Sequence, residues 1–142
     1  MTVFAVSVYN VLEVIAMKTK RLIFAFAAVG LFAAEILIGA YAGGFVRSYI
    51  GDVLVVVLIF ALLRAFTPKK PKLLALYVML FAFAVEFLQI TSYFGIINEN
   101  TPYLIRMIAG GSFSVWDLVS YAAGALLCAV LEIIVTKATK QS

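Results

Sequence analysis

The chain has 142 residues, of which 65% are hydrophobic and only 13% are charged. A soluble domain of this length cannot bury so many apolar side chains, because small domains keep a large share of their surface exposed. The composition therefore excludes an ordinary soluble domain. It predicts an all-α fold, a polytopic membrane protein whose transmembrane helices form one bundle.

The net charge of +4 comes from basic residues that lie in short clusters between apolar runs. A nucleic-acid partner would favour basic residues along one face, so we interpret these clusters as topology signals instead. Cys128 is the only cysteine and the chain has no histidine. These counts exclude a disulfide within the chain and a zinc site of the usual Cys/His type, and no cofactor is expected.

Residues 2–16 are apolar but too few to cross a bilayer, which requires about 20 residues. The alternation that begins with Val3 and Ala5 favours a strand over a helix. Met17 and the basic residues that follow it are typical of a natural N-terminus. Residues 1–20 are thus a tail that is either an overlong start or an interfacial segment, and both interpretations stay open.

A secretory signal peptide is a further interpretation of this region. Basic residues at 18–21 precede an apolar stretch at 22–34 and a small-x-small pattern at 40–42. Glu35 and more apolar residues follow that stretch, which makes it long for a cleaved signal. We expect the span to be retained, and the intact mass of the mature protein tests this: loss of everything before Gly43 would contradict it.

Four apolar runs approach the length of about 20 residues that crosses the hydrocarbon at about 1.5 Å per residue. They cover residues 21–41, 50–66, 73–97 and 115–136. Prolines and lysines at 67–72 end the second run as a polar turn, and a polar stretch at 98–114 separates the last two. The sequence predicts one domain of four transmembrane helices over residues 21–136, followed by a tail at 137–142.

Nine of the eleven basic residues lie beside connections on one side of this bundle: Lys18, Lys20, Arg21, Arg64, Lys69, Lys70, Lys72, Lys137 and Lys140. The opposite connections carry only Arg47 and Arg106. Because short loops rich in Lys and Arg stay in the cytoplasm, both termini are expected to be cytoplasmic. The expected location is a bacterial inner membrane, with the bilayer as partner. Glu13 and Glu132 are expected at the membrane interface.

Four acidic residues lie toward the outer side of the predicted spans: Glu35, Asp52, Glu86 and Asp117. A charge at the centre of a membrane helix costs about 2.5 to 3.5 kcal/mol, so such residues usually face a bundle interior, a partner or water. Glu86 and Gln89 share a helix face, and Asp117 shares another with Tyr121. The candidate ligand-binding residues are Glu35, Arg47, Asp52, Glu86, Gln89, Arg106, Asp117 and Tyr121, with no catalytic residue and no metal ligand.

Two interpretations of these residues remain. In the functional one they line a polar pocket at the outer face, with four carboxylates against two guanidiniums. In the structural one Asp52 and Asp117 cap helix N-termini, and Glu86 pairs with an arginine to fix the packing. Capping does not account for Glu35 and Glu86 in helix interiors. Small residues at 120–125 allow close packing of the fourth helix, within the bundle or against a second copy.

Three elements carry a resemblance: Arg-Ser-Tyr-Ile-Gly-Asp-Val-Leu at 47–54, Phe-Ala-Val-Glu-Phe-Leu-Gln at 83–89, and Phe-Ser-Val-Trp-Asp at 113–117 continuing to Tyr-Ala-Ala-Gly at 121–124. Over residues 21–135 the chain resembles a bacterial family of small, uncharacterised four-helix membrane proteins and, more distantly, the VanZ-like family. VanZ-like proteins commonly have Asn in place of Tyr121. They also have an Arg shortly before the Asp, whereas Arg106 lies eleven residues ahead of Asp117.

The resemblance implies this architecture and a link to the cell envelope, since VanZ-like proteins are associated with resistance to lipoglycopeptide antibiotics. We predict binding of a polar or phosphorylated envelope ligand, such as a lipid-linked one, in an outer-leaflet acidic pocket. The alternatives are a cation or proton transporter, which would need a dimer for alternating access, and an accessory subunit of a larger complex. Enzymatic activity is less favoured, because carboxylates alone act as acid and base only when their pKa values are driven apart.

Overall fold

The protein is seen here as a computed structural model that describes residues 2–67, 73–109 and 111–141. The described elements are helices: α1 (Thr2–Tyr41), the π-helical turn η1 (Val46–Ile50), α2 (Gly51–Phe66), α3 (Leu74–Tyr93), α4 (Tyr103–Ala109) and α5 (Val115–Gln141). Four stretches of the described chain are long and apolar enough to cross a membrane: Thr2–Tyr41, Val46–Phe66, Leu74–Tyr93 and Val115–Thr139. The predicted all-α fold with four spanning-length helices is confirmed.

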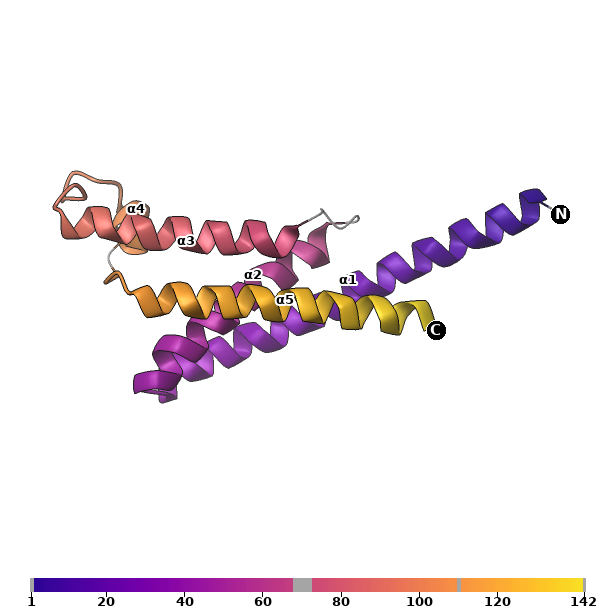
Figure 1. The fold of residues 1–142 in the computed structure, drawn as a ribbon, viewed down its shortest axis with the longest axis horizontal. Coiled ribbons are helices and arrows are strands. Elements are labelled where there is room, and N and C mark those ends of the chain that lie inside the picture. The colour runs from indigo at the N-terminus through magenta and orange to yellow at the C-terminus, as the bar shows by residue number, and fades with distance from the viewer. Residues whose placement is uncertain (1, 68–72, 110, 142) are drawn as a thin grey trace.

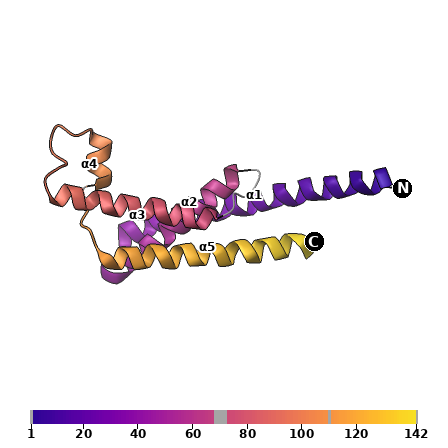
Figure 2. The ribbon, with the colours of Figure 1, turned by 45° about the horizontal axis from the view of Figure 1, so that its top comes forward.

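The helices form an elongated bundle in which α2 contacts α1, α3 and α5 (Figures 1 and 2). Its core is apolar, and Val56 and Phe60 of α2 are buried together with Val78 of α3 and Cys128 of α5. The ring of Phe24 on α1 meets that of Phe60 edge to face, with 5.8 Å between centroids. A single layer of apolar side chains from α2 therefore joins the other long helices.

Gly124 allows α5 to approach α2 closely. A Cβ at this position would lie 2.9 Å from the carbonyl oxygen of Val53 and 2.9 Å from the Cβ of Val56, distances that real Cβ contacts do not reach. Ser120, Tyr121 and neighbouring small residues on this face of α5 are also buried. The predicted close packing of the fourth helix within the bundle is thus observed, while pairing with a second copy stays a prediction.

The first half of α1 departs from the sequence interpretation. Residues 2–16 continue the helix without a break instead of forming a strand, so the strand expectation was wrong. The described residues offer no neighbouring strand here, and only a helix pairs its backbone N–H and C=O groups within one segment. This half projects beyond the other helices (Figures 1 and 2), and its side chains up to Ile15 are exposed. The proposed division of the chain at residue 20 stays a prediction.

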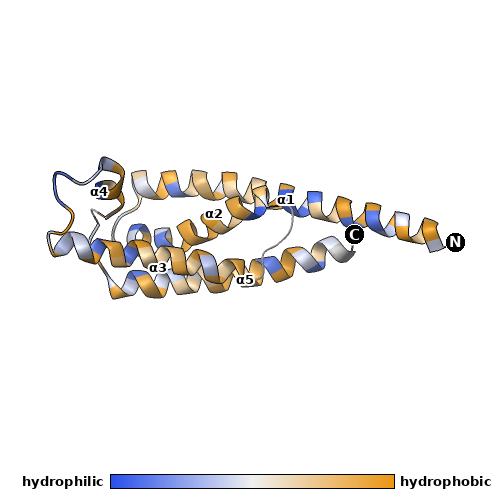
Figure 3. Cartoon of the chain, turned by 90° about the horizontal axis from the view of Figure 1, so that it is seen from above, coloured by the Kyte–Doolittle hydropathy of each residue, from blue (hydrophilic) through white to orange (hydrophobic). Residues whose placement is uncertain are grey.

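The connections also differ in detail. The third span ends at Tyr93 instead of residue 97, because Gly95 takes a left-handed conformation with φ of +71°. The predicted polar stretch at 98–114 contains the short helix α4, and Figure 3 shows hydrophilic residues gathered in the loop beside it. The polar turn predicted at 67–72 lies outside the described residues except for Thr67, which ends α2.

Candidate functional site

The four acidic residues of the prediction converge at one end of the bundle, although they come from α1, α2, α3 and α5. The Asp52 carboxyl group lies close enough to those of Asp117, Glu86 and Glu35 to interact with them electrostatically. A Cβ on Gly51 would lie 3.9 Å from Glu35 Oε2, which places that carboxylate beside the first turn of α2. We call these four residues the carboxyl cluster.

Glu86 is the most enclosed member of the cluster, with 0% of its surface exposed. Its Oε1 accepts a hydrogen bond of 2.7 Å from the backbone N–H of Ser114, immediately before α5. Its Oε2 accepts one of 3.3 Å from the Tyr121 hydroxyl, two turns into α5. Both carboxylate oxygens therefore hold α3 against the start of α5. The arginine partner that the structural interpretation assigned to Glu86 is replaced by a backbone amide and a phenol.

Ser114, and not Asp117, caps the N-terminus of α5. The Ser114 Oγ accepts a hydrogen bond of 3.3 Å from the backbone N–H of Trp116. In a capping box the third residue of the helix would accept the N–H of the cap residue, and here Glu86 of another helix takes that role. The carboxyl group of Asp117 is thereby left to meet Asp52 across the α2 and α5 interface.

Asp52 is likewise not a helix cap. The cap position of α2 is Ile50, and no side chain hydrogen-bonds there, although Asp52 lies in the first turn where a negative charge suits the helix dipole. The carboxyl groups of Asp52 and Asp117 are close enough to interact electrostatically across the interface of α2 and α5. The pair therefore brings together groups that would repel each other if both were ionised.

Glu35 is the member of the cluster without a partner. Its Oε1 is buried and has no hydrogen bond to any described residue. Buried polar atoms are nearly always hydrogen-bonded, and an exception calls for an explanation such as a bound ion or ligand. Glu35 lies late in α1, and its side chain is partly exposed as a whole. This oxygen is an unused acceptor at the edge of the cluster.

The predicted arginines do not enter the cluster. Arg47 on η1 and Arg106 on α4 are both exposed, and neither forms an ion pair within the described chain. Gln89 also points elsewhere. It packs against Gly111, where a Cβ would lie 2.8 Å from its Nε2, and it lines a separate hollow of about 590 Å³ with Tyr93 and Phe94. The structure thus joins the acids and Tyr121 and leaves the other predicted site residues outside.

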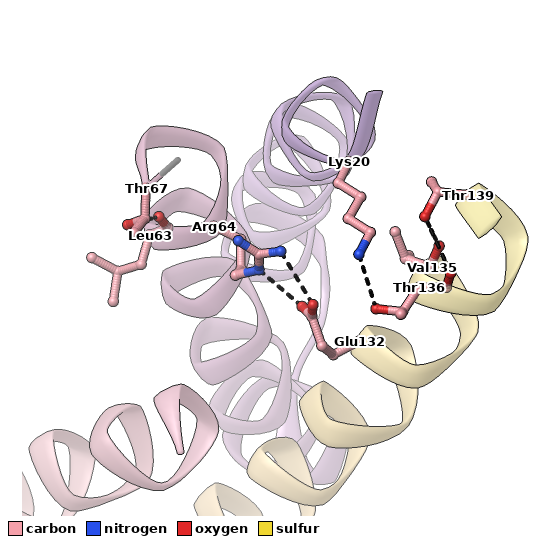
Figure 4. Close-up of polar contacts among 8 residues, drawn as sticks. All are labelled: Lys20, Leu63, Arg64, Thr67, Glu132, Val135, Thr136 and Thr139. Carbon is pink, nitrogen blue, oxygen red and sulfur yellow. Dashed lines mark hydrogen bonds and ion pairs between the residues drawn. The ribbon is translucent and has the colours of Figure 1, made fainter. Parts of the chain in front are cut away.

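A second polar cluster, near the other end of the bundle, was not predicted (Figure 4). Arg64 of α2 and Glu132 of α5 form a bidentate ion pair with N–O distances of 2.9 and 3.1 Å, and both are buried. The Arg64 guanidinium also lies 5.2 Å from the ring centroid of Phe24. Sequence analysis uses Arg64 only as a topology signal and does not predict this pair, and the placement of Glu132 at the membrane interface stays a prediction. The sequence does contain a signal for this pair, because Arg64 and Glu132 are opposite charges that lie near the same side of the bundle on two different spans.

The chemistry open to the carboxyl cluster is acceptance of hydrogen bonds and binding of positive charge. Among the described residues no group of three or more His, Cys, Asp or Glu side chains is arranged to hold a metal ion. Tyr121 uses its hydroxyl proton on Glu86. An N–H donor or a proton is therefore the partner that suits the free oxygen of Glu35.

These features define a multi-pass membrane protein with spanning-length helices and buried carboxyl groups at one end of its bundle. The model of a protein family described as a protein of unknown function, DUF2809, matches residues 41–125, and the chain belongs to this family. The match contains all three elements on which the predicted resemblance rests. No curated protein and no solved structure matches the chain. Kinship to the VanZ-like family stays a prediction.

Proposed function

We propose that this protein binds a positively charged polar group of a cell-envelope ligand at the carboxyl cluster, in the outer leaflet of a bacterial inner membrane. The observation that carries the proposal is the buried Oε1 of Glu35, which has no hydrogen-bond partner in the described chain. An ammonium group offers N–H donors and a charge that offsets the neighbouring carboxylates. The outer placement rests on the distribution of basic residues in the sequence.

The charge balance of the site supports a cation over a phosphate. The four carboxyl groups gather without an ion pair to any described Lys or Arg. A phosphorylated ligand would need the guanidiniums of Arg47 and Arg106, which are exposed and unpaired within the described chain. A ligand with both an ammonium and a phosphate would use the cluster for the first group and these arginines for the second.

The apolar core between the two polar clusters favours binding over transport. Along α5 the distance from Asp117 to Glu132 is about 22 Å at 1.5 Å per residue. The bundle between them is filled by Val56, Phe60 and Cys128, each with at most 1% of its surface exposed. An ion that crossed one copy of the bundle would have to pass this apolar layer, where an unpaired charge is costly.

The test uses the full chain in lipid nanodiscs with ethanolamine and spermidine as probes, and binding is measured by calorimetry or by the shift in thermal unfolding. A ligand at 100 times its Kd adds about 2.7 kcal/mol to stability. We expect tetramethylammonium to bind more weakly, because it has no N–H donor for Glu35 Oε1. Glycerol phosphate serves as the anionic control.

The variants are Glu35→Gln and the double change Asp52→Asn with Asp117→Asn, and Glu99→Gln in the exposed loop is the matched control. We expect each cluster variant to lower ammonium affinity at least tenfold, while Glu99→Gln leaves it unchanged. Equal affinity in the wild type and the double variant would contradict the proposal, as would failure of the wild type to bind either amine.

A further inference from the structure

An apolar groove runs between α1 and α2 on the outside of the bundle. It encloses about 450 Å³ and is lined by uncharged side chains, among them Val29 and Phe32 of α1 and Leu62 and Phe66 of α2. Val29, Phe32, Leu62 and Phe66 are all exposed, so the described chain does not cover this face. The groove has the polarity of an acyl chain and offers no hydrogen-bonding side chain to a polar ligand.

A smaller, basic hollow continues this groove toward the middle of α1. It encloses about 300 Å³ and is lined by Lys18 and Arg21, with Ala25 and Ala65 shared between the two spaces. Lys18, Arg21, Ala25 and Val29 follow one another at intervals of three and four residues, so they form a single stripe on α1. The molecule thus presents two cations at the end of an apolar channel.

Arg21 is fixed at the junction of the two spaces. Its Nε donates a hydrogen bond of 2.9 Å to the carbonyl oxygen of Ala65, at the end of α2. The terminal N–H groups of its guanidinium have no other partner in the described chain, and the lining of the hollow contains no carboxylate. Lys20 points instead to α5, where its Nζ donates to Thr136 Oγ1 at 3.3 Å (Figure 4). Arg21 and Lys18 therefore line the hollow that adjoins the groove.

We propose that this surface is a binding site for an anionic phospholipid, with an acyl chain in the α1 and α2 groove and the phosphate of the headgroup against Arg21 and Lys18. The charge pattern selects this occupant, because basic pockets beside spanning helices suit anionic headgroups. The length of the groove along α1 also suits an acyl chain. Ala25 to Phe32 covers about 10 Å of helix, which lies within one leaflet of a hydrocarbon core about 30 Å thick.

Native mass spectrometry of the full chain tests the site, with phosphatidylglycerol and phosphatidylcholine of identical acyl chains as probes. We expect phosphatidylglycerol to bind at least tenfold more tightly. Lys18→Gln, at an exposed side chain, should lower that affinity about fivefold, and the further change Arg21→Gln should lower it again. Lys137→Gln, exposed on α5, is the matched control and should leave it unchanged.

Val29→Trp tests the contribution of the apolar groove to lipid binding independently of the two basic residues. The larger side chain fills the channel without touching Lys18 or Arg21, and we expect it to reduce phosphatidylglycerol binding while circular dichroism stays unchanged. Glycerol phosphate, which has no acyl chain, should bind far more weakly than the lipid. Equal binding of both phospholipids, full affinity in Val29→Trp, or a stoichiometric protein that copurifies at this face would each overturn the assignment.

Discussion

Glu86 on α3 accepts the backbone N–H of Ser114, the residue that caps α5, at 2.7 Å. The first N–H groups of a helix have no partner within it, and a capping box normally satisfies them from the same chain segment. Here a fully buried carboxylate from a neighbouring helix supplies the acceptor. The start of α5 is therefore specified by tertiary structure, and the buried carboxyl group of Glu86 has a structural role as well as a place in the carboxyl cluster.

Glu86→Leu should destabilise the protein more than Glu86→Gln. Leucine leaves the Ser114 N–H and the Tyr121 hydroxyl without their acceptor, at about 1 to 3 kcal/mol for each buried donor. Glutamine keeps an acceptor for Ser114 and can donate to Tyr121, so its cost should stay below about 1.5 kcal/mol. Thermal unfolding in detergent measures both. A Glu99→Leu control should be near neutral, and equal losses for Leu and Gln at position 86 would show that these two hydrogen bonds contribute little.

Gly124→Ala should destabilise the bundle by about 1 to 3 kcal/mol, because the new methyl group would overlap the backbone of α2 at Val53 and the side chain of Val56. Gly39→Ala on α1 is the matched control, since its added Cβ would meet no atom within 4 Å apart from the neighbouring residues and backbone of its own helix. That change should be neutral or stabilising by up to about 1 kcal/mol through helix propensity. If both variants unfold at the same temperature, the close approach of α5 to α2 is not what stabilises the bundle.

The buried ion pair of Arg64 with Glu132 should show strong coupling. Glu132→Gln leaves a guanidinium without its charged partner and should cost about 3 to 5 kcal/mol, whereas a double change to Arg64→Met and Glu132→Leu should recover most of that loss. The readout is the unfolding midpoint in a denaturing detergent for Arg64→Met alone, Glu132→Leu alone and the double variant. A double variant as unstable as the sum of the two single ones would exclude coupling between these residues.

The long helices could be predicted from the sequence because each apolar run approaches the length that crosses a bilayer, and a membrane leaves few alternatives to a helix. The convergence of Glu35, Asp52, Glu86 and Asp117 was also predictable, since chain reversal at each connection brings alternate helix ends to one side. Chain direction and polarity place residues along the axis of the bundle, but they do not determine how each helix is rotated about its own axis.

Helix rotation and local contacts explain the features that could not be predicted from the sequence. Gln89 lies three residues from Glu86, yet it packs on Gly111 outside the cluster because the chain before α5 folds back over the end of α3. The pairing of Arg64 with Glu132 depends on how α2 and α5 face each other, which no single helix pattern determines. In residues 2–16 the alternation that begins with Val3 and Ala5 favours a strand, and the continuation of α1 overrides that local preference.

The orientation of the bundle can be tested by cysteine labelling in intact cells. In a Cys128→Ala background, Glu99→Cys in the loop before α4 should react with a membrane-impermeant maleimide added from outside, because the basic residues place this loop on the outer side. Lys137→Cys on α5 should react only after the membrane is opened. Both positions are exposed, so a difference in labelling reports sidedness instead of burial. The reverse pattern would place the carboxyl cluster toward the cytoplasm and would exclude an outer-leaflet ligand.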